Sequence, residues 1–224
     1  MPLCGATRKA LWVAPQGGKT IFVDFSTTNR QPRWGKRDML LFELYPYILL
    51  LYFVNMIVRK ATYSDAPIIW EILQQAIEQR RQDGSDQWQN GYPNEQTVHD
   101  DIANGYGYVL VNNNDIWAYA AIIFGIEPAY NDIIGAWLTS GNYAVVHRVA
   151  VCDAVKGKGI ATLLFYEVEH LCTAKKVYSI KVDTNFDNRP MLKILANLGY
   201  QYCGEIFFNG APRKAFEKVL ANHE

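Results

Sequence analysis

From Met56 onward, hydrophobic and polar positions follow the two periods that are typical of helices and strands. Ser64 and Asp65 can cap a helix that we expect to continue to about Arg81, because its apolar residues recur with helical spacing on one face. Asn94 can cap a second, shorter helix. The same spacing predicts two further helices, which we place at residues 159–173 and 188–198.

Short apolar runs between these helices predict strands. We expect them at residues 57–61, 108–111, 116–125, 143–151 and 177–182, with two more that flank Asn209-Gly210 and end near Val219. An Asn-Gly pair between apolar runs is a strong signal for a two-residue hairpin. Residues 127–141 are expected to form a loop. Strands that alternate with helices predict one α/β (α+β) domain over residues 56–224, with a mixed central sheet of about six or seven strands and about four helices.

The first 55 residues do not continue this pattern, and we treat residues 1–55 as an N-terminal extension of open status. Residues 39–54 form an apolar block that is too short for a membrane helix and is interrupted by Glu43 and Pro46. Three interpretations remain: an amphipathic or membrane-touching extension, a packed accessory segment, or a stretch upstream of a natural start at Met56.

Composition narrows the class of protein. Half of the residues are hydrophobic, which is enough for a sizeable core, and 22 basic residues balance 22 acidic ones. That balance argues against a nucleic-acid partner. The four cysteines and four histidines are dispersed without ligand spacing, so we expect reduced thiols and no bound metal. These features favour a cytoplasmic protein, and we do not expect a membrane partner.

The segment KGKGIAT, residues 156–162, joins an apolar strand to an amphipathic helix. The first turn of such a helix has amide groups without intrahelical partners, and the helix dipole is positive there. Small residues let an anion approach the backbone closely, and the two lysines add positive charge. The segment therefore predicts a phosphate site, with an ordinary strand-to-helix turn as the alternative. It is not a dinucleotide fingerprint, because Thr162 replaces the third glycine.

Residues 149–164 resemble motif A of the GNAT-type N-acetyltransferase superfamily, whose core is Gln/Arg-x-x-Gly-x-Gly/Ala. Lys156 stands at the basic position, Gly159 at the glycine and Ala161 at the final small residue. Residues 183–200, DTNFDNRPMLKILANLGY, resemble motif B, in which an Asn-containing loop precedes a helix that ends in Leu-Gly-Phe/Tyr. The resemblance extends over about residues 56–220.

The resemblance implies a GNAT fold in which two splayed parallel strands, here 143–151 and 177–182, bind acetyl-CoA. One strand would pair with the pantetheine arm like an added β-strand, and the turn would hold the pyrophosphate. The residues assigned to the cofactor in this way are Val149, Ala150, Val151, Lys156, Gly157, Lys158, Gly159, Ile160, Ala161, Thr162, Asn185 and Asn188. For Asn185 and Asn188 the alternatives are a loop turn and a helix cap.

The implied reaction is direct transfer of an acetyl group from acetyl-CoA to a primary amine of a small molecule or peptide. The amine must lose a proton before it attacks. Leu195 stands where many relatives have an acidic tyrosine, and Val145 stands where histone-type relatives have a catalytic glutamate. A catalytically weak or inactive acyl-CoA-binding module is therefore the alternative function, and a homodimer is left open.

Candidate catalytic residues must then come from elsewhere in the chain. Glu127 is one candidate base, with a solvated loop carboxylate as its alternative. His147 is another, because a histidine pKa suits proton transfer near neutrality, with a core histidine as its alternative. Tyr143 could shape the acceptor site or supply an acid, or simply fill the core. Three aromatic residues could wall an acceptor pocket: Trp88, Tyr92 and Trp137.

Overall fold

The computed structural model describes residues 56–208 and 210–221. The predictions made for residues 1–55, for Asn209 and for Cys4 lie outside the described residues. Among the described residues, no helix has the length and apolar character that a membrane crossing requires. Cys172 and Cys203 are buried free thiols, in agreement with the expectation for these two residues, and burial raises the pKa of Cys172 to about 12.

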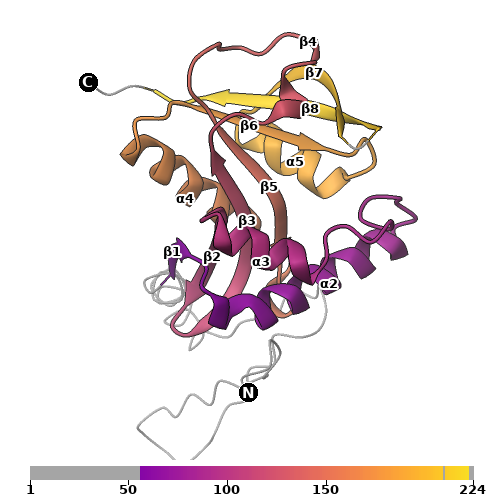
Figure 1. The fold of residues 1–224 in the computed structure, drawn as a ribbon, viewed down its shortest axis with the longest axis vertical. Helices are drawn as coiled ribbons and strands as arrows, with labels where there is room; N and C mark the ends of the chain where they lie inside the picture. Colours follow the sequence, from indigo (N-terminus) through magenta and orange to yellow (C-terminus); the bar gives the residue numbers. More distant parts are fainter. Residues whose placement is uncertain (1–55, 209, 222–224) are drawn as a thin grey trace, which may run out of the picture. The chain divides into compact units, whose positions relative to one another are not determined.

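A mixed sheet forms the centre of the described part of the chain (Figure 1). It has eight strands in the order β1-β2-β3-β5-β6-β8-β7-β4, and all neighbours are antiparallel except β5 and β6. The strands are β1 Met56–Lys60, β2 Gly107–Asn112, β3 Asp115–Phe124, β4 Ile134–Gly135, β5 Ala144–Val151, β6 Ser179–Thr184, β7 Gln201–Phe208 and β8 Ala211–Val219.

Helices cover both faces of this sheet, with α2 and α3 on one face and α4 on the other (Figure 1). Every residue of β2 is buried, as expected for a strand that is covered on both faces. The helices are α2 Ala66–Gln82, α3 Glu95–Ala103, α4 Ile160–Ala174 and α5 Arg189–Asn197, with short 3-10 turns η1 Tyr63–Asp65, η2 Pro128–Tyr130 and η3 Asp153–Val155. The mixed α/β class and the four helices are as predicted.

The helix starts show which local signals were correct. The Asn94 side chain accepts a hydrogen bond from the Thr97 amide at 3.0 Å, so it caps α3 as predicted. Asp65 precedes α2, but its carboxylate does not cap that helix. It instead accepts hydrogen bonds from the Arg59 guanidinium and from the Thr62 amide, which ties the start of α2 to β1.

The segment predicted as a loop, residues 127–141, contains η2 and the short strand β4. β4 pairs with β7 at Ile134↔Glu205 and Gly135↔Gly204. The backbones approach so closely that a Cβ at Gly135 would lie 2.2 Å from the Cys203 carbonyl oxygen, which only glycine permits. β4 raises the strand number to eight, above the predicted six or seven, because two residues are too short to show a strand period.

Candidate functional site

The parallel strands β5 and β6 separate along their length (Figure 1). They pair only at Ala144↔Ile180 and Val145↔Lys181. Beyond these pairs β5 continues along β3, and β6 continues along β8. The facing edges of β5 and β6 therefore have backbone groups that do not pair with each other. This is the splayed arrangement that the sequence resemblance implies.

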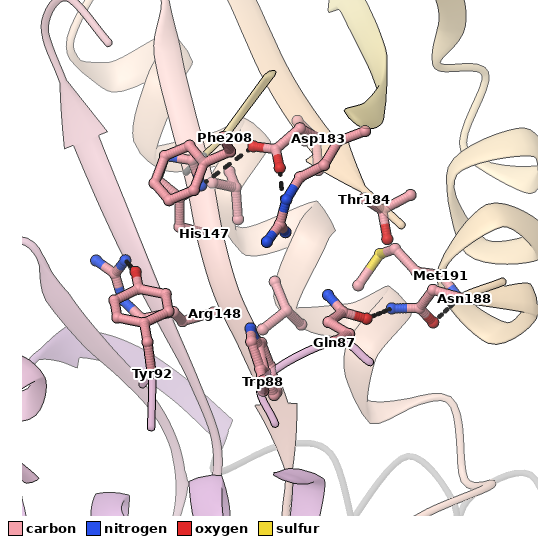
Figure 2. A pocket seen from close by; sticks show the side chains of 14 residues that line it. Gln87, Trp88, Tyr92, His147, Arg148, Asp183, Thr184, Asn188, Met191 and Phe208 are labelled. Carbon is pink, nitrogen blue, oxygen red and sulfur yellow. Dashed lines mark hydrogen bonds and ion pairs between the residues drawn. The ribbon is translucent and has the colours of Figure 1, made fainter. Parts of the chain in front are cut away.

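A pocket opens where the two strands separate, and we call it the gap pocket (Figure 2). Its walls come from β5, β6, the α2–α3 loop, the start of α5 and the β7–β8 hairpin. The lining residues are Gln87, Trp88, Tyr92, Val146, His147, Arg148, Val149, Val182, Asp183, Thr184, Asn188, Met191, Phe208 and Arg213. Of the three aromatic residues proposed as walls of an acceptor pocket, Trp88 and Tyr92 line the gap pocket, whereas Trp137 lines a different pocket.

A β-bulge interrupts β5 beside the gap pocket. The register between β3 and β5 shifts between Tyr119 and Ala121, and Arg148 lies opposite this shift with φ of 54°. The left-handed region costs a non-glycine residue roughly 1–2 kcal/mol, so surrounding contacts must hold Arg148 there. A bulge bends its strand, and this one lies beyond Val145, the last residue of β5 that pairs with β6.

Asp101 of α3 holds this bulge. Its carboxylate accepts two hydrogen bonds from the Arg148 guanidinium, from Nε at 2.8 Å and from Nη2 at 2.6 Å. The Tyr119 hydroxyl also donates to Asp101, and Arg148 donates to the Tyr92 hydroxyl (Figure 2). Burial alone would lower the pKa of Arg148, but the Asp101 carboxylate raises it above its usual value. A buried ion pair therefore fixes β5 to α3.

His147 lies between two carboxylates. Its Nε2 is 3.1 Å from Glu127 Oε2, and its Nδ1 is 3.4 Å from Asp183 Oδ1 (Figure 2 shows the second contact). Asp183 also accepts a hydrogen bond from the Tyr130 hydroxyl at 2.8 Å and lies 3.5 Å from the Arg213 guanidinium. All three members of the His147 cluster, Glu127, His147 and Asp183, have largely buried side chains.

The carboxylates control the charge of the imidazole. Burial disfavours the imidazolium, but the hydrogen bonds that the ring donates to Asp183 and Glu127 outweigh this effect and raise the pKa of His147. A neutral imidazole has one N–H, so it would leave one of the two carboxylates facing an unprotonated nitrogen. Conversely, the bond to His147 lowers the pKa of Glu127, and it lowers that of Asp183 despite the burial of this carboxyl.

The structure brings together the three predicted catalytic residues. Glu127 contacts His147, and the Tyr143 hydroxyl accepts a hydrogen bond from the Glu127 amide at 3.1 Å. Of these three, His147 lines the gap pocket, so it is the one placed to contact a bound molecule. Asp183 was missed as a member of this cluster. The available signal was its position at the end of a buried strand, at the start of the segment that resembles motif B.

The turn at residues 156–162, which the sequence analysis proposed as a phosphate site, leads from η3 into α4. Gly157 and Gly159 have φ of 76° and 79°, which favour glycine. Gly159 is the N-cap of α4 and gives that helix no side-chain cap, so its first amides remain available. Lys156 pairs with Asp153, and the Lys158 ammonium donates to the Ala154 carbonyl at 3.2 Å. Both lysines thus contact residues of the preceding 3-10 turn, η3.

The other residues assigned to the cofactor lie in different surroundings. Val149 lines the gap pocket, while Ala150 pairs with Tyr119 of β3. Asn188 also lines the pocket; it accepts a hydrogen bond from the Met191 amide at 3.3 Å and donates to Gln87 at 3.1 Å. Asn188 thus caps α5 and connects it to the α2–α3 loop. The Asn185 carbonyl accepts from the Asn188 amide, which is a loop-turn contact.

Comparison with known proteins agrees with this geometry. Residues 69–200 match the model of the acetyltransferase (GNAT) family, so the chain belongs to that family. No curated protein matches the sequence.

Solved structures of similar fold cover nearly all of the described chain. An acetyltransferase of the GNAT family from Streptococcus agalactiae 2603 is 34% identical, with TM-score 0.70, and the match covers 75% of this chain and 96% of that one. An acetyltransferase of the GNAT family from Listeria monocytogenes 4b F2365 is 20% identical, with TM-score 0.61, and the match covers 74% and 95%. The structure of yncA from Salmonella typhimurium, with its cofactor acetyl-CoA, is 16% identical, with TM-score 0.54 and coverage of 76% and 96%.

Proposed function

We propose that this GNAT-family acetyltransferase moves an acetyl group from acetyl-CoA directly to a primary amine of a small molecule or peptide. The observation that carries the proposal is His147 in the gap pocket, held by hydrogen bonds to two carboxylates. A titratable side chain with a shifted pKa in a cleft is a candidate for proton transfer.

The residues present fit acetyl-CoA. The unpaired edge of β5 at residues 149–151 can hold an extended arm through backbone hydrogen bonds, because β6 has separated from it. The turn at residues 156–162 can hold the pyrophosphate, since a Cβ at Gly157 or Gly159 would find no atom within 4 Å and the surface there is open. When bound, acetyl-CoA supplies the activated acetyl group.

His147 removes the proton from the acceptor. An alkyl ammonium with a pKa of about 10.4 cannot attack until it is neutral, so a base must face it. Neutral His147 can accept that proton only at its unprotonated ring nitrogen, so the acceptor amine must displace the carboxylate that faces this nitrogen, while the other carboxylate continues to accept a hydrogen bond from the ring. Glu127 and Asp183 therefore position the ring and stabilise its charged form, and Tyr143 holds the Glu127 backbone.

The departing CoA thiolate does not require a general acid at position 195, where many relatives have a tyrosine. Leu195 and Val145 are fully buried core residues, so neither position reaches a pocket. A thiol pKa of about 8.5 means that the thiolate can leave without a proton. The same two residues support the alternative function, an acyl-CoA-binding module without turnover.

The test measures thiol release from acetyl-CoA against a panel of primary amines, with the full chain and with His147→Gln. Removal of a general base should reduce kcat/KM about 100-fold or more, while binding of acetyl-CoA stays the same. The matched control is His170→Gln, because His170 is a histidine with a 76% exposed side chain on α4. Equal transfer by His147→Gln would refute the role of His147. Binding without transfer to any amine would establish the binding module instead.

A further inference from the structure

A second pocket lies between the 127–141 segment and β6, and we call it the Lys181 pocket. Its walls include the rings of Trp137 and Tyr143, the polar side chains of Thr139 and Ser140, and Lys181 of β6. It is separate in its lining residues from the gap pocket. The proposed acetyl transfer uses Tyr143, which holds the Glu127 backbone, but it gives no role to Lys181.

The buried Lys181 ammonium has no hydrogen-bond partner in the part of the chain that the structure describes, although the nearby Glu217 carboxylate acts to raise its pKa. Only 4% of the residue is exposed, and no ion pair or hydrogen bond joins its ammonium to another residue in the described ranges. The Nζ atom instead lies 4.3 Å from the centre of the Trp137 ring and 4.0 Å from that of Tyr143. Burial lowers the pKa of Lys181. Ring faces attract a cation but do not replace hydrogen-bond acceptors.

The obvious partner of Lys181 is occupied elsewhere. Glu217 of β8 is its directly opposed cross-strand neighbour, so the two side chains share one face of the sheet. Glu217 is 0% exposed, yet its carboxylate accepts hydrogen bonds from Ser179, from Thr139 and from the Leu138 amide. The acceptor sites of Glu217 are thus filled by the 127–141 segment and β6. The Lys181 ammonium remains directed at the pocket.

We propose that the Lys181 pocket binds a small carboxylate, whose oxygens accept hydrogen bonds from the Lys181 ammonium. An attached apolar group would lie against Trp137. A buried lysine that lines a pocket satisfies its hydrogen bonds with an anion better than with an aromatic ring.

Two side chains that line the Lys181 pocket also form hydrogen bonds with members of the His147 cluster. Tyr143 lines the pocket and accepts a hydrogen bond from the Glu127 amide, and Tyr130 lines it and donates to Asp183. One source of the carboxylate is the amine acceptor itself. This source depends on the proposed function, because it requires that the chain acetylates an amine. The carboxylate could equally belong to a separate small acid. Both sources present the same chemistry to Lys181.

The binding test uses benzoate and the full chain. Benzoate should shift the NMR signal of the Lys181 ammonium and leave that of Lys214 unchanged. In calorimetry, Lys181→Met should weaken benzoate binding about tenfold or more, because a charge-assisted hydrogen bond is lost. The control Lys214→Met should bind within about twofold, since Lys214 also contacts two aromatic rings but lines neither pocket.

The outcomes separate the alternatives. No shift of the Lys181 signal in the unsubstituted chain, or equal benzoate binding by a folded Lys181→Met variant, would overturn the proposal. If Lys181→Met does not fold, the proposal is judged by whether benzoate shifts the NMR signal of the Lys181 ammonium in the unsubstituted chain. Competition between benzoate and an amine acceptor, with a higher KM in Lys181→Met only for acceptors that carry a carboxylate, identifies the acceptor as the source. Benzoate that binds without competing identifies a separate acid. These binding readouts remain valid if acetyl transfer fails.

Discussion

His147 couples two opposite effects at one side chain. Its burial disfavours the charged ring, but Glu127 and Asp183 favour it more, so the ring holds its proton to a higher pH than an exposed histidine does. A base of this kind is useful only above its own pKa. The carboxylates strengthen His147 as a base and also restrict the pH range in which it is neutral.

The pH profile of kcat/KM tests this arrangement. We expect the rate to rise with pH through an inflection above 6.5, the usual value for histidine, because only neutral His147 can accept a proton. The free energy of unfolding changes with pH in the opposite direction. The stabilisation contributed by protonated His147 is complete below pH 6.5, and it is lost as the pH rises through the raised pKa of the folded state. Profiles recorded over a range of pH with the unsubstituted chain and His147→Gln provide the measurement. An inflection below 6.5, or one retained in His147→Gln, would contradict it.

The sequence could identify part of this cluster but not its pairing. Glu127 and His147 could be named because each is a titratable residue at the end of, or within, a predicted strand that borders the resembled motifs. Their contact could not be predicted, since it depends on how the 127–141 segment folds back over β5. Asp183 joins them only through the parallel register of β5 and β6, which no local spacing encodes.

At the scale of elements, the bulge in β5 connects three parts of the fold. Arg148 in β5 pairs with Asp101 in α3, and Asp101 accepts a hydrogen bond from Tyr119 in β3. The strained backbone at Arg148 lies next to His147 and Val149, which both line the gap pocket. The ion pair therefore fixes the strand that presents the proposed base and the cofactor edge.

Asp101→Asn tests the importance of this pair for stability. It leaves the buried Arg148 charge without a carboxylate, so we expect a loss of about 3 kcal/mol or more in the free energy of unfolding. Urea unfolding followed by circular dichroism measures it. Asp100→Asn is the matched control, because Asp100 is the exposed neighbour on the same helix and should change stability by less than about 0.5 kcal/mol. Equal unfolding energies for the two variants would show that the pair does not hold the bulge.

Elements differ in how far the sequence predicts them. α2 and α4 were predicted nearly to their ends, because one apolar face repeats along the whole of each helix. β4 was missed, since its two residues are defined by close backbone contact between Gly135 and Gly204 rather than by any pattern. The Arg148–Asp101 pair was missed for a related reason, because its members are 47 positions apart.

At the scale of the whole molecule, we propose that residues 56–224 form one domain that binds acetyl-CoA by itself. β1, Met56–Lys60, pairs along its full length with β2. The gap pocket and the turn at residues 156–162 are both built within this range. The elements that position them, from α3 to the β7–β8 hairpin, also lie after Met56.

A chain that starts at Met56 should therefore keep its stability and its cofactor binding. We expect its melting temperature to lie within about 4 °C of that of the full chain, which corresponds to about 1 kcal/mol for a domain of this size. Acetyl-CoA at about 100 times its Kd should stabilise both forms equally, by about 2.7 kcal/mol, because the same site binds it. Thermal unfolding with and without acetyl-CoA compares the two forms. A short chain that melts much earlier would show that residues 1–55 pack on the domain, and a normal melting temperature without stabilisation by acetyl-CoA would show that they complete the cofactor site.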